Sequence, residues 1–311
     1  MLTIQLNMVN TNVIRKKILD TLRNNSQPVS GELMSNELGF SRVALWKHIK
    51  ALKEAGYIIQ SGAKGYTIDT SEDYLYPWEF AEYSNKIEHF SSINSTMDVA
   101  SNGHYDDGTI IVAESQNNGR GTKGRYWSSQ NGGLFFTVIN KKQIPAHLYL
   151  QESFRSLVIL HNVMQKYFSI DVSLKWPNDI LYGDKKIAGV LSESYIAGDR
   201  CKFINIGIGV NVNNMVELNE GVSLHSILNK QISRRQILQH FLDEYRDSQN
   251  AKKNPVDEFK SLVIQTKQKI KYKAGSQNTY GIVEDVTQTG AAIVSDGQNK
   301  IKIYPGEKSE K

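Results

Sequence analysis

The segment GRGTKGRYW, residues 119–127, places three glycines at the G-x-G-x-x-G spacing that is typical of dinucleotide-binding loops. Such a loop needs a strand before it and a helix after it, because the N-terminus of the helix holds the pyrophosphate. The run TIIVAES before it reads as a strand, but the run RYWSSQNGGLFFTVIN after it is also rich in β-formers. The G-x-x-x-x-G-K-[ST] spacing of a P-loop is absent as well. We therefore predict a flexible, cationic loop between two strands, which can close over an anion.

The first 67 residues carry a positive charge that the rest of the chain lacks. They contain nine Lys and Arg against four Asp and Glu, and in the remainder the two kinds are equal in number. A neutral body with a basic N-terminal module suggests an anionic partner for that module, and nucleic acid is the first candidate.

The pattern of this module predicts a winged helix-turn-helix. A helix over residues 11–24 is followed by a short helix that ends at Gly39, a third helix from the N-cap Ser41 to Gly56, and a hairpin in YIIQSGAKGYTI. The apolar faces expected on the first and third helices are Val13, Ile14, Ile18, Leu19 and Leu22, and Val43, Leu45, Ile49 and Leu52. The side chains predicted to contact DNA are Ser41, Arg42, Lys47, His48, Lys50 and Lys64. The alternative is a winged helix used for protein contacts, with solvated cations.

Several other classes are disfavoured by composition. The single cysteine, Cys201, excludes an internal disulfide and fits a reducing cytoplasm. The N-terminal apolar stretch is too short to span a bilayer, and we predict neither a signal peptide nor a membrane segment. The seven histidines are scattered, so no metal site held by protein ligands alone is expected.

A second candidate constellation lies in KWPNDILYGDKKIAGVLSE. Pro177 interrupts regular strand pairing and directs Asn178 and Asp179 toward a site. A turn at Gly183 then brings Lys186 back on the returning strand. An edge hairpin with solvated lysines is the plainer interpretation, and this segment alone does not decide between the two.

Taken together, the segments GRGTKGRYWSS, KWPNDI, KIAGVLSE and GIGVNV, in this order behind a winged helix, resemble the bifunctional biotin–protein ligases that also act as biotin-operon repressors. The resemblance covers nearly the whole chain and implies an α+β fold. The implied domains are a winged helix-turn-helix (1–68), a linker (69–85), a ligase domain with a class II synthetase-like mixed sheet (86–264) and an SH3-like barrel (265–311). Short strands with turns at Gly275, Gly281, Gly290 and Gly297 support the barrel.

The resemblance also implies the chemistry. Biotin and ATP, with Mg²⁺, would form biotinyl-AMP, and the biotinyl group would pass to a lysine of the carboxyl carrier domain of a biotin-dependent carboxylase. The adenylate-bound chain would form a homodimer that binds operator DNA. Such an enzyme needs cations between two anions but no protein nucleophile, because the biotin carboxylate itself attacks.

By family motif, the catalytic candidates are Arg120, Arg125, Lys186 and Asp179. The biotin-binding candidates are Ser95, Thr96, Met97, Gln116, Arg120, Gly121, Thr122, Lys186, Gly207 and Gly209. The nucleotide-binding candidates are Asn178, Asn211 and Arg125. Two positions depart from the family pattern. Met97 stands where a polar residue is common. Thr122 stands where arginine is usual, which removes a cation from the loop, so we hypothesise that the adenylate is retained less tightly unless Lys123 compensates. A sensor without catalytic activity and a lipoate or octanoate ligase are the competing functions.

Overall fold

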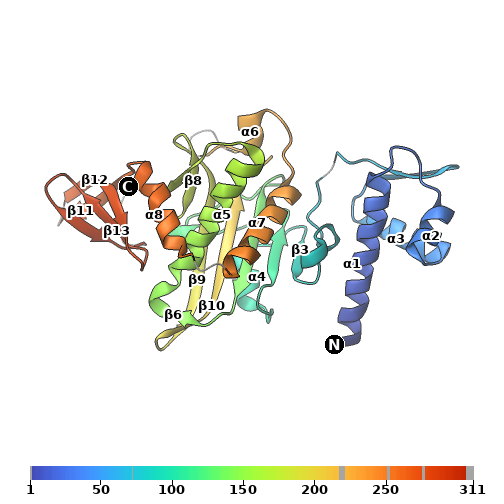
Figure 1. Ribbon diagram of the computed structural model, residues 1–311, viewed down its shortest axis with the longest axis horizontal. Helices are drawn as coiled ribbons and strands as arrows, with labels where there is room; N and C mark the ends of the chain where they lie inside the picture. Colours follow the sequence, from blue (N-terminus) through green and yellow to red (C-terminus); the bar gives the residue numbers. More distant parts are fainter. Residues whose placement is uncertain (1, 72, 217–220, 251–252, 275–276, 306–311) are drawn as a thin grey trace. The chain divides into compact units, whose positions relative to one another are not determined.

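The computed structural model describes residues 2–71, 73–216, 221–250, 253–274 and 277–305, and Figure 1 shows its helices and strands. The contacts divide the chain into two compact units, residues 1–89 and residues 90–311. The domain boundaries predicted from the sequence stay a prediction.

The N-terminal unit has the predicted order of a winged helix-turn-helix. Its elements are α1 (Leu2–Arg23), α2 (Gly31–Leu38), α3 (Arg42–Glu54), β1 (Ile59–Gly62) and β2 (Gly65–Ile68), and the two strands are antiparallel. The Oγ atom of Ser41 accepts from the Ala44 N–H at 3.2 Å, which is the predicted cap of α3. Gly39 ends α2 with a φ of +73°, a conformation that glycine adopts without strain.

The predicted apolar faces of α1 and α3 are right except at one position in each helix. The buried members are Ile18, Leu19, Leu22, Leu45, Ile49 and Leu52. Val13 is 43% exposed and Val43 is 65% exposed. Both predictions were wrong because these two valines fall outside the stripe of residues, three or four apart, that faces the core.

The segment after the wing packs onto the N-terminal unit through η1 (Pro77–Glu79) and η2 (Ala81–Tyr83). The buried Glu79 carboxylate accepts two hydrogen bonds of 2.8 Å from the Arg23 guanidinium and one of 2.5 Å from the Tyr57 hydroxyl. The indole N–H of Trp78 donates to the same hydroxyl at 2.9 Å. Burial, and after it the Glu79 carboxylate, raises the pKa of Tyr57, so that its hydroxyl remains a donor.

The second unit is built on a sheet with strand order β3-β4-β5-β10-β9-β8-β7, in which neighbouring strands from β4 to β7 pair antiparallel, and β6 pairs with β10. The strands are β3 (Ile87–Phe90), β4 (Ile110–Ala113), β5 (Leu134–Asn140), β6 (Ile144–Pro145), β7 (Ser173–Lys175), β8 (Asp179–Tyr182), β9 (Lys185–Ala197) and β10 (Arg200–Val210). All seven residues of β5 are buried, so this strand lies at the centre of the core.

Helices cover this sheet (Figure 1). They are α4 (Thr96–Asn102), α5 (Leu150–Phe168), α6 (Leu224–Leu228), α7 (Arg234–Asn250) and α8 (Pro255–Gln265). The sequence predicts a helix between Pro145 and Asp171 from its apolar periodicity, and a second one after the capping box Ser233-x-x-Gln236. Helices α5 and α7 confirm both predictions, whereas α8 was not predicted. Its signal was present, since Asn254 caps it through the Val256 N–H and Pro255 occupies its first position. The rings of Phe154 and Phe259 stack at 4.2 Å and join α8 to α5.

The C-terminal strands form an open antiparallel sheet, so the SH3-like barrel is not confirmed. Its order is β11 (Lys269–Ala274), β12 (Gln277–Val286), β13 (Ala292–Ser295) and β14 (Lys300–Ile303). Gly290 and Gly297 lie in turns with φ of +86° and +93°. Gly281 instead lies within β12, so the turn predicted there was wrong. A Cβ atom at this position would be 2.5 Å from Val294 Cγ1, which explains the glycine. Gly275 lies outside the described residues.

None of the helices in the described part of the chain is long and apolar enough to cross a membrane.

Candidate functional site

The glycine-rich segment is a loop between the antiparallel strands β4 and β5, as the flanking sequence predicts. The only regular element described within it is a single 3-10 turn, η3 (Thr122–Gly124). The loop closes on itself, because Gly121 N–H donates to the Arg125 carbonyl and Trp127 N–H donates to the Gly119 carbonyl, both at 2.8 Å. It therefore provides no helix N-terminus for a pyrophosphate.

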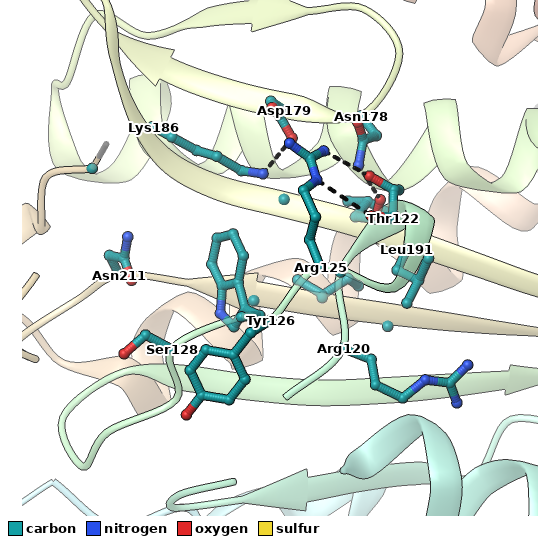
Figure 2. A pocket seen from close by; sticks show the side chains of 18 of the residues that line it. Arg120, Thr122, Arg125, Tyr126, Ser128, Asn178, Asp179, Lys186, Leu191 and Asn211 are labelled. Carbon is teal, nitrogen blue, oxygen red and sulfur yellow. Dashed lines mark hydrogen bonds and ion pairs between the residues drawn. The ribbon is translucent and has the colours of Figure 1, made fainter. Parts of the chain in front are cut away.

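This loop forms one wall of a pocket of about 750 Å³ (Figure 2). The start of α4, the β8–β9 hairpin and β10 supply other walls. Every side chain or glycine that the sequence marked for catalysis, biotin or nucleotide lines it: Ser95, Thr96, Met97, Gln116, Arg120, Gly121, Thr122, Arg125, Asn178, Asp179, Lys186, Gly207, Gly209 and Asn211. The structure thus brings the two constellations together, and the role of each residue stays a prediction.

Lys186 and Asp179 face each other across the β8–β9 hairpin. Its two-residue turn contains Gly183, with a φ of +56°, and the Lys186 Nζ atom lies 2.6 Å from Asp179 Oδ1. The same ammonium group is 4.8 Å from the centre of the Trp127 ring. Lys186 is therefore held in the pocket by one carboxylate and one aromatic face.

Arg120 is held differently. Its guanidinium donates to Asp98 Oδ1 at 2.6 Å and to Glu193 Oε1, and Figure 2 shows it pointing away from Arg125 and Lys186. Two carboxylates from α4 and β9 therefore compensate its charge. Neither acid was singled out from the sequence.

Arg125 extends toward Asn178 and Asp179 in Figure 2. Its Nη2 atom donates to Thr122 Oγ1 at 2.9 Å, and its Nε atom donates to the Thr122 carbonyl at 3.3 Å. Thr122 lacks the charge of the arginine that is usual at this position, but its hydroxyl and carbonyl oxygens orient the guanidinium of Arg125.

Buried polar groups occupy one end of the pocket. The Thr96 N–H donates to Gln116 Oε1 at 2.7 Å, and Gln116 Nε2 donates to Ser129 Oγ at 2.8 Å. Thr137 of β5 donates to the Thr96 hydroxyl at 2.9 Å. These contacts orient hydroxyl and amide groups with little freedom to rotate, as recognition of a polar ring requires.

The amides of Asn178 and Asn211 are also oriented by neighbours. Asn178 Nδ2 donates to the Val190 carbonyl at 3.0 Å, and Asn211 Oδ1 accepts from Asn214 Nδ2 at 3.1 Å.

Three glycines form a floor on β9 and β10. A Cβ atom at Gly207 would lie 2.7 Å from the Met97 Sδ atom, and one at Gly209 would lie 2.5 Å from Trp127 Nε1. Gly189, which pairs with Gly209, lies beneath the same indole. We expected Gly207 and Gly209 to admit a ligand, but in this structure protein side chains lie over both. Trp127 was not predicted as a site residue, and no local pattern in the sequence marks it.

No group of three or more His, Cys, Asp or Glu side chains is placed to hold a metal ion within the ranges that the structure describes.

Comparison with known proteins gives two family matches. Residues 89–211 match the biotin/lipoate A/B protein ligase family, and residues 14–67 match a helix-turn-helix domain. The bifunctional ligase/repressor BirA of Bacillus subtilis is 30% identical over 304 residues, which cover 90% of this chain and 93% of that protein. The chain belongs to the biotin/lipoate protein ligase family. It is a biotin–protein ligase with a helix-turn-helix repressor domain.

Two further relatives agree with this membership. The bifunctional ligase/repressor BirA of Escherichia coli is 28% identical over 208 residues, covering 65% of this ligase and 64% of that protein. The solved structure of a biotin protein ligase from Aquifex aeolicus, in complex with biotin and ATP, has a TM-score of 0.59 and 26% identity. It covers 71% of this chain and 97% of that one.

The repressor domain of this ligase presents its candidate DNA contacts on the exposed side of α3 and on the wing. Ser41, Arg42, Lys47, Lys50 and Lys64 are exposed. His48 is half-buried, and burial, followed by the charge of Arg15, lowers its pKa. The lowered pKa favours the neutral ring, so His48 is less suited than the neighbouring lysines to pair with phosphate. Trp46, 54% exposed, lies on the same helix and was not predicted.

Proposed function

We propose that this biotin–protein ligase works in two steps within the pocket of Figure 2. In the first, a biotin carboxylate oxygen attacks the α-phosphorus of ATP. The bond from that phosphorus to the bridging oxygen breaks, and pyrophosphate leaves. In the second, the amine of an acceptor lysine attacks the carbonyl carbon of biotinyl-AMP, AMP leaves, and the nitrogen loses a proton. The acceptor is the carboxyl carrier domain of a biotin-dependent carboxylase.

The cations in the pocket make the first step possible. The two reacting groups are both anionic, so a positive charge must lie where they meet. Lys186 and Arg125 point into the same region, and we assign both to the α-phosphate. Asp179 orients Lys186, and we assign it to accept the proton of the incoming amine in the second step.

Magnesium is proposed to arrive with ATP. Asp179 already contacts Lys186 at 2.6 Å, and the described part of the chain offers no cluster of three acidic, His or Cys side chains. These residues fit a metal held mainly by the phosphates, which is common for Mg²⁺. When bound, the ion neutralises phosphate charge.

Arg120 is assigned to the biotin carboxylate and the adenylate phosphate. Its present partners, Asp98 and Glu193, are each more than a third exposed on the side chain. Competition from an anionic ligand against such screened pairs costs little free energy.

One observation supports this function above all: Arg125 of the loop and Lys186 of the hairpin point into one region of the pocket. Biotin-dependent exchange of labelled pyrophosphate into ATP tests it. Exchange with biotin supports the proposal, and exchange with lipoate alone would assign the chain to the other branch of its family. If the chain binds biotin but supports exchange of pyrophosphate into ATP with neither acid, it would be a sensor without catalytic activity.

The loop residue Thr122 should weaken retention of the adenylate. Replacing Thr122 with arginine adds a cation to the lid over an anionic intermediate, and we expect biotinyl-AMP to dissociate about tenfold more slowly. Release of preloaded, labelled adenylate measures this rate. The matched variant Thr122→Ser keeps the hydroxyl that accepts from Arg125 and should release at the wild-type rate. Equal rates for Thr122→Arg and wild type would reject the hypothesis.

The DNA contacts are proposed for the six predicted side chains of α3 and the wing. Replacing the exposed Arg42 with alanine should weaken binding to a random-sequence duplex. It should also reduce the magnitude of the negative slope of log affinity against log salt by about one, because one phosphate contact is lost. Fluorescence anisotropy at several salt concentrations measures both quantities. Lys202→Ala removes one exposed charge from β10 and should leave the slope unchanged. An unchanged slope in Arg42→Ala would mean that Arg42 contacts no phosphate.

We also propose a homodimer of the adenylate-bound ligase. Strand β8 pairs with β9 at residues 185–189, and the Val190 N–H still donates to the Asn178 carbonyl, so residues 191–197 extend beyond this pairing. Tyr195 and Ile196 on this extension are 57% and 45% exposed. A free strand edge with exposed apolar side chains supports pairing of two copies. Operator DNA is the expected partner of such a dimer, and the cytoplasm is its expected location.

A further inference from the structure

Met97 lines the pocket, yet almost all of its surface is covered by other protein atoms. It is the second residue of α4, its N–H donates to the Ser95 Oγ atom at 3.2 Å, and its side chain is only 3% exposed. Its neighbours Ser95 and Thr96 belong to the polar end of the pocket. The thioether is therefore fixed beside the groups that are proposed to hold the biotin ring.

The space occupied by this thioether exists because residue 207 is glycine. Gly207 lies in β10, paired with Thr137 of β5 and Leu191 of β9. A Cβ atom there would lie 2.7 Å from Met97 Sδ and 2.8 Å from Met97 Cγ. Such distances are shorter than real Cβ contacts, so Met97 rests directly on the strand backbone. An alanine at this position would push the thioether out toward the pocket.

We propose that Met97, seated on Gly207, sets the depth of the ring-binding end of the pocket and is a specificity-determining residue of this ligase. The inference rests on the proposed biotin site and adds that Gly207 acts on the ligand only through Met97. A flexible, polarizable thioether fills the irregular space left between a polar cradle and a bare strand. The ligand surface that meets it is the apolar part of a bicyclic ring.

The test is a double-mutant cycle on the full chain, with the dissociation constant for biotin measured by calorimetry. Met97→Ala should bind biotin at least about tenfold more weakly, because lost apolar contacts in a pocket have effects of this size. Gly207→Ala should also weaken binding, by displacing the thioether. The double variant Met97→Ala/Gly207→Ala should bind as well as Met97→Ala or better, since the added methyl group then enters vacated space.

Two controls separate this role from general destabilisation. Met164→Ala truncates a fully buried methionine of α5 that does not line the pocket, and it should leave the biotin constant within about twofold. Met97→Leu conserves volume and should stay within about threefold of wild type. If Gly207→Ala does not fold, the comparison of the double variant with Met97→Ala still carries the test.

An additive cycle, in which Gly207→Ala weakens binding by the same factor with or without Met97, would overturn the inference, because Gly207 would then contact the ligand itself. Wild-type affinity in Met97→Ala would overturn it as well. A wild-type chain that binds no biotin would overturn the proposed function together with this inference, so the two failures are distinguishable.

Discussion

Replacing Lys186 with alanine should slow biotin-dependent pyrophosphate exchange by about a thousandfold, because loss of one preorganised group that stabilises developing charge has effects of this size. The substitution removes the ammonium group that lies 2.6 Å from Asp179 and 4.8 Å from the centre of the Trp127 ring. It also leaves the Asp179 carboxylate facing a triphosphate without its cation. Initial exchange rates at saturating biotin and ATP measure the effect.

The neighbouring Lys185 provides the matched control. It lies in the same strand but is exposed and does not line the pocket, so Lys185→Ala should exchange within about twofold of wild type. Lys186→Arg should be intermediate, since a planar guanidinium keeps the charge but not the compact geometry of an ammonium group. A Lys186→Ala enzyme within tenfold of wild type would remove Lys186 from the catalytic assignment.

The sequence predicted the contents of the site better than its internal contacts. Residue types at fixed spacing predicted the loop and the hairpin, and the family resemblance added the glycines of β10. The partners of Arg120 could not be found in this way, because Glu193 reaches it only through the register of β9 on β10. The position of Trp127 likewise depends on the pairing of Gly189 with Gly209. Local patterns carry no information on such contacts between strands.

The fold shows the same limit. Helix periodicity located α3, but Val43 was placed on the wrong side, because alternate apolar residues do not specify which face meets the core. Glycine spacing predicted the turns at Gly290 and Gly297 correctly. It failed at Gly281, where the close approach of Val294 from β13 excludes a side chain. A glycine in a β-rich segment therefore indicates either a turn or a close contact, and only the tertiary structure distinguishes them.

Replacing Glu79 with alanine should destabilise the N-terminal unit by about 3 kcal/mol or more, because a buried ion pair loses one partner while the other stays buried. The Glu79 side chain is 1% exposed and accepts from Arg23 twice and from Tyr57 once. Its removal leaves a guanidinium and a hydroxyl without their acceptor. Hydrogen exchange of α1 and α3 should then accelerate by about two orders of magnitude.

The exchange measurement also locates the effect within the chain. Amides of α5, in the second unit, should exchange at the wild-type rate, because Arg23, Tyr57 and Trp78 all lie within residues 1–89. Glu37→Ala, which removes an exposed carboxylate from α2, serves as the control. It should change the hydrogen-exchange rates of α1 and α3 by less than about threefold. Operator affinity should fall in Glu79→Ala but not in Glu37→Ala. The reason is that α3, which carries the proposed DNA contacts, belongs to the N-terminal unit that Glu79→Ala destabilises. Unchanged protection of α1 would mean that the segment after the wing contributes nothing to the stability of the repressor domain.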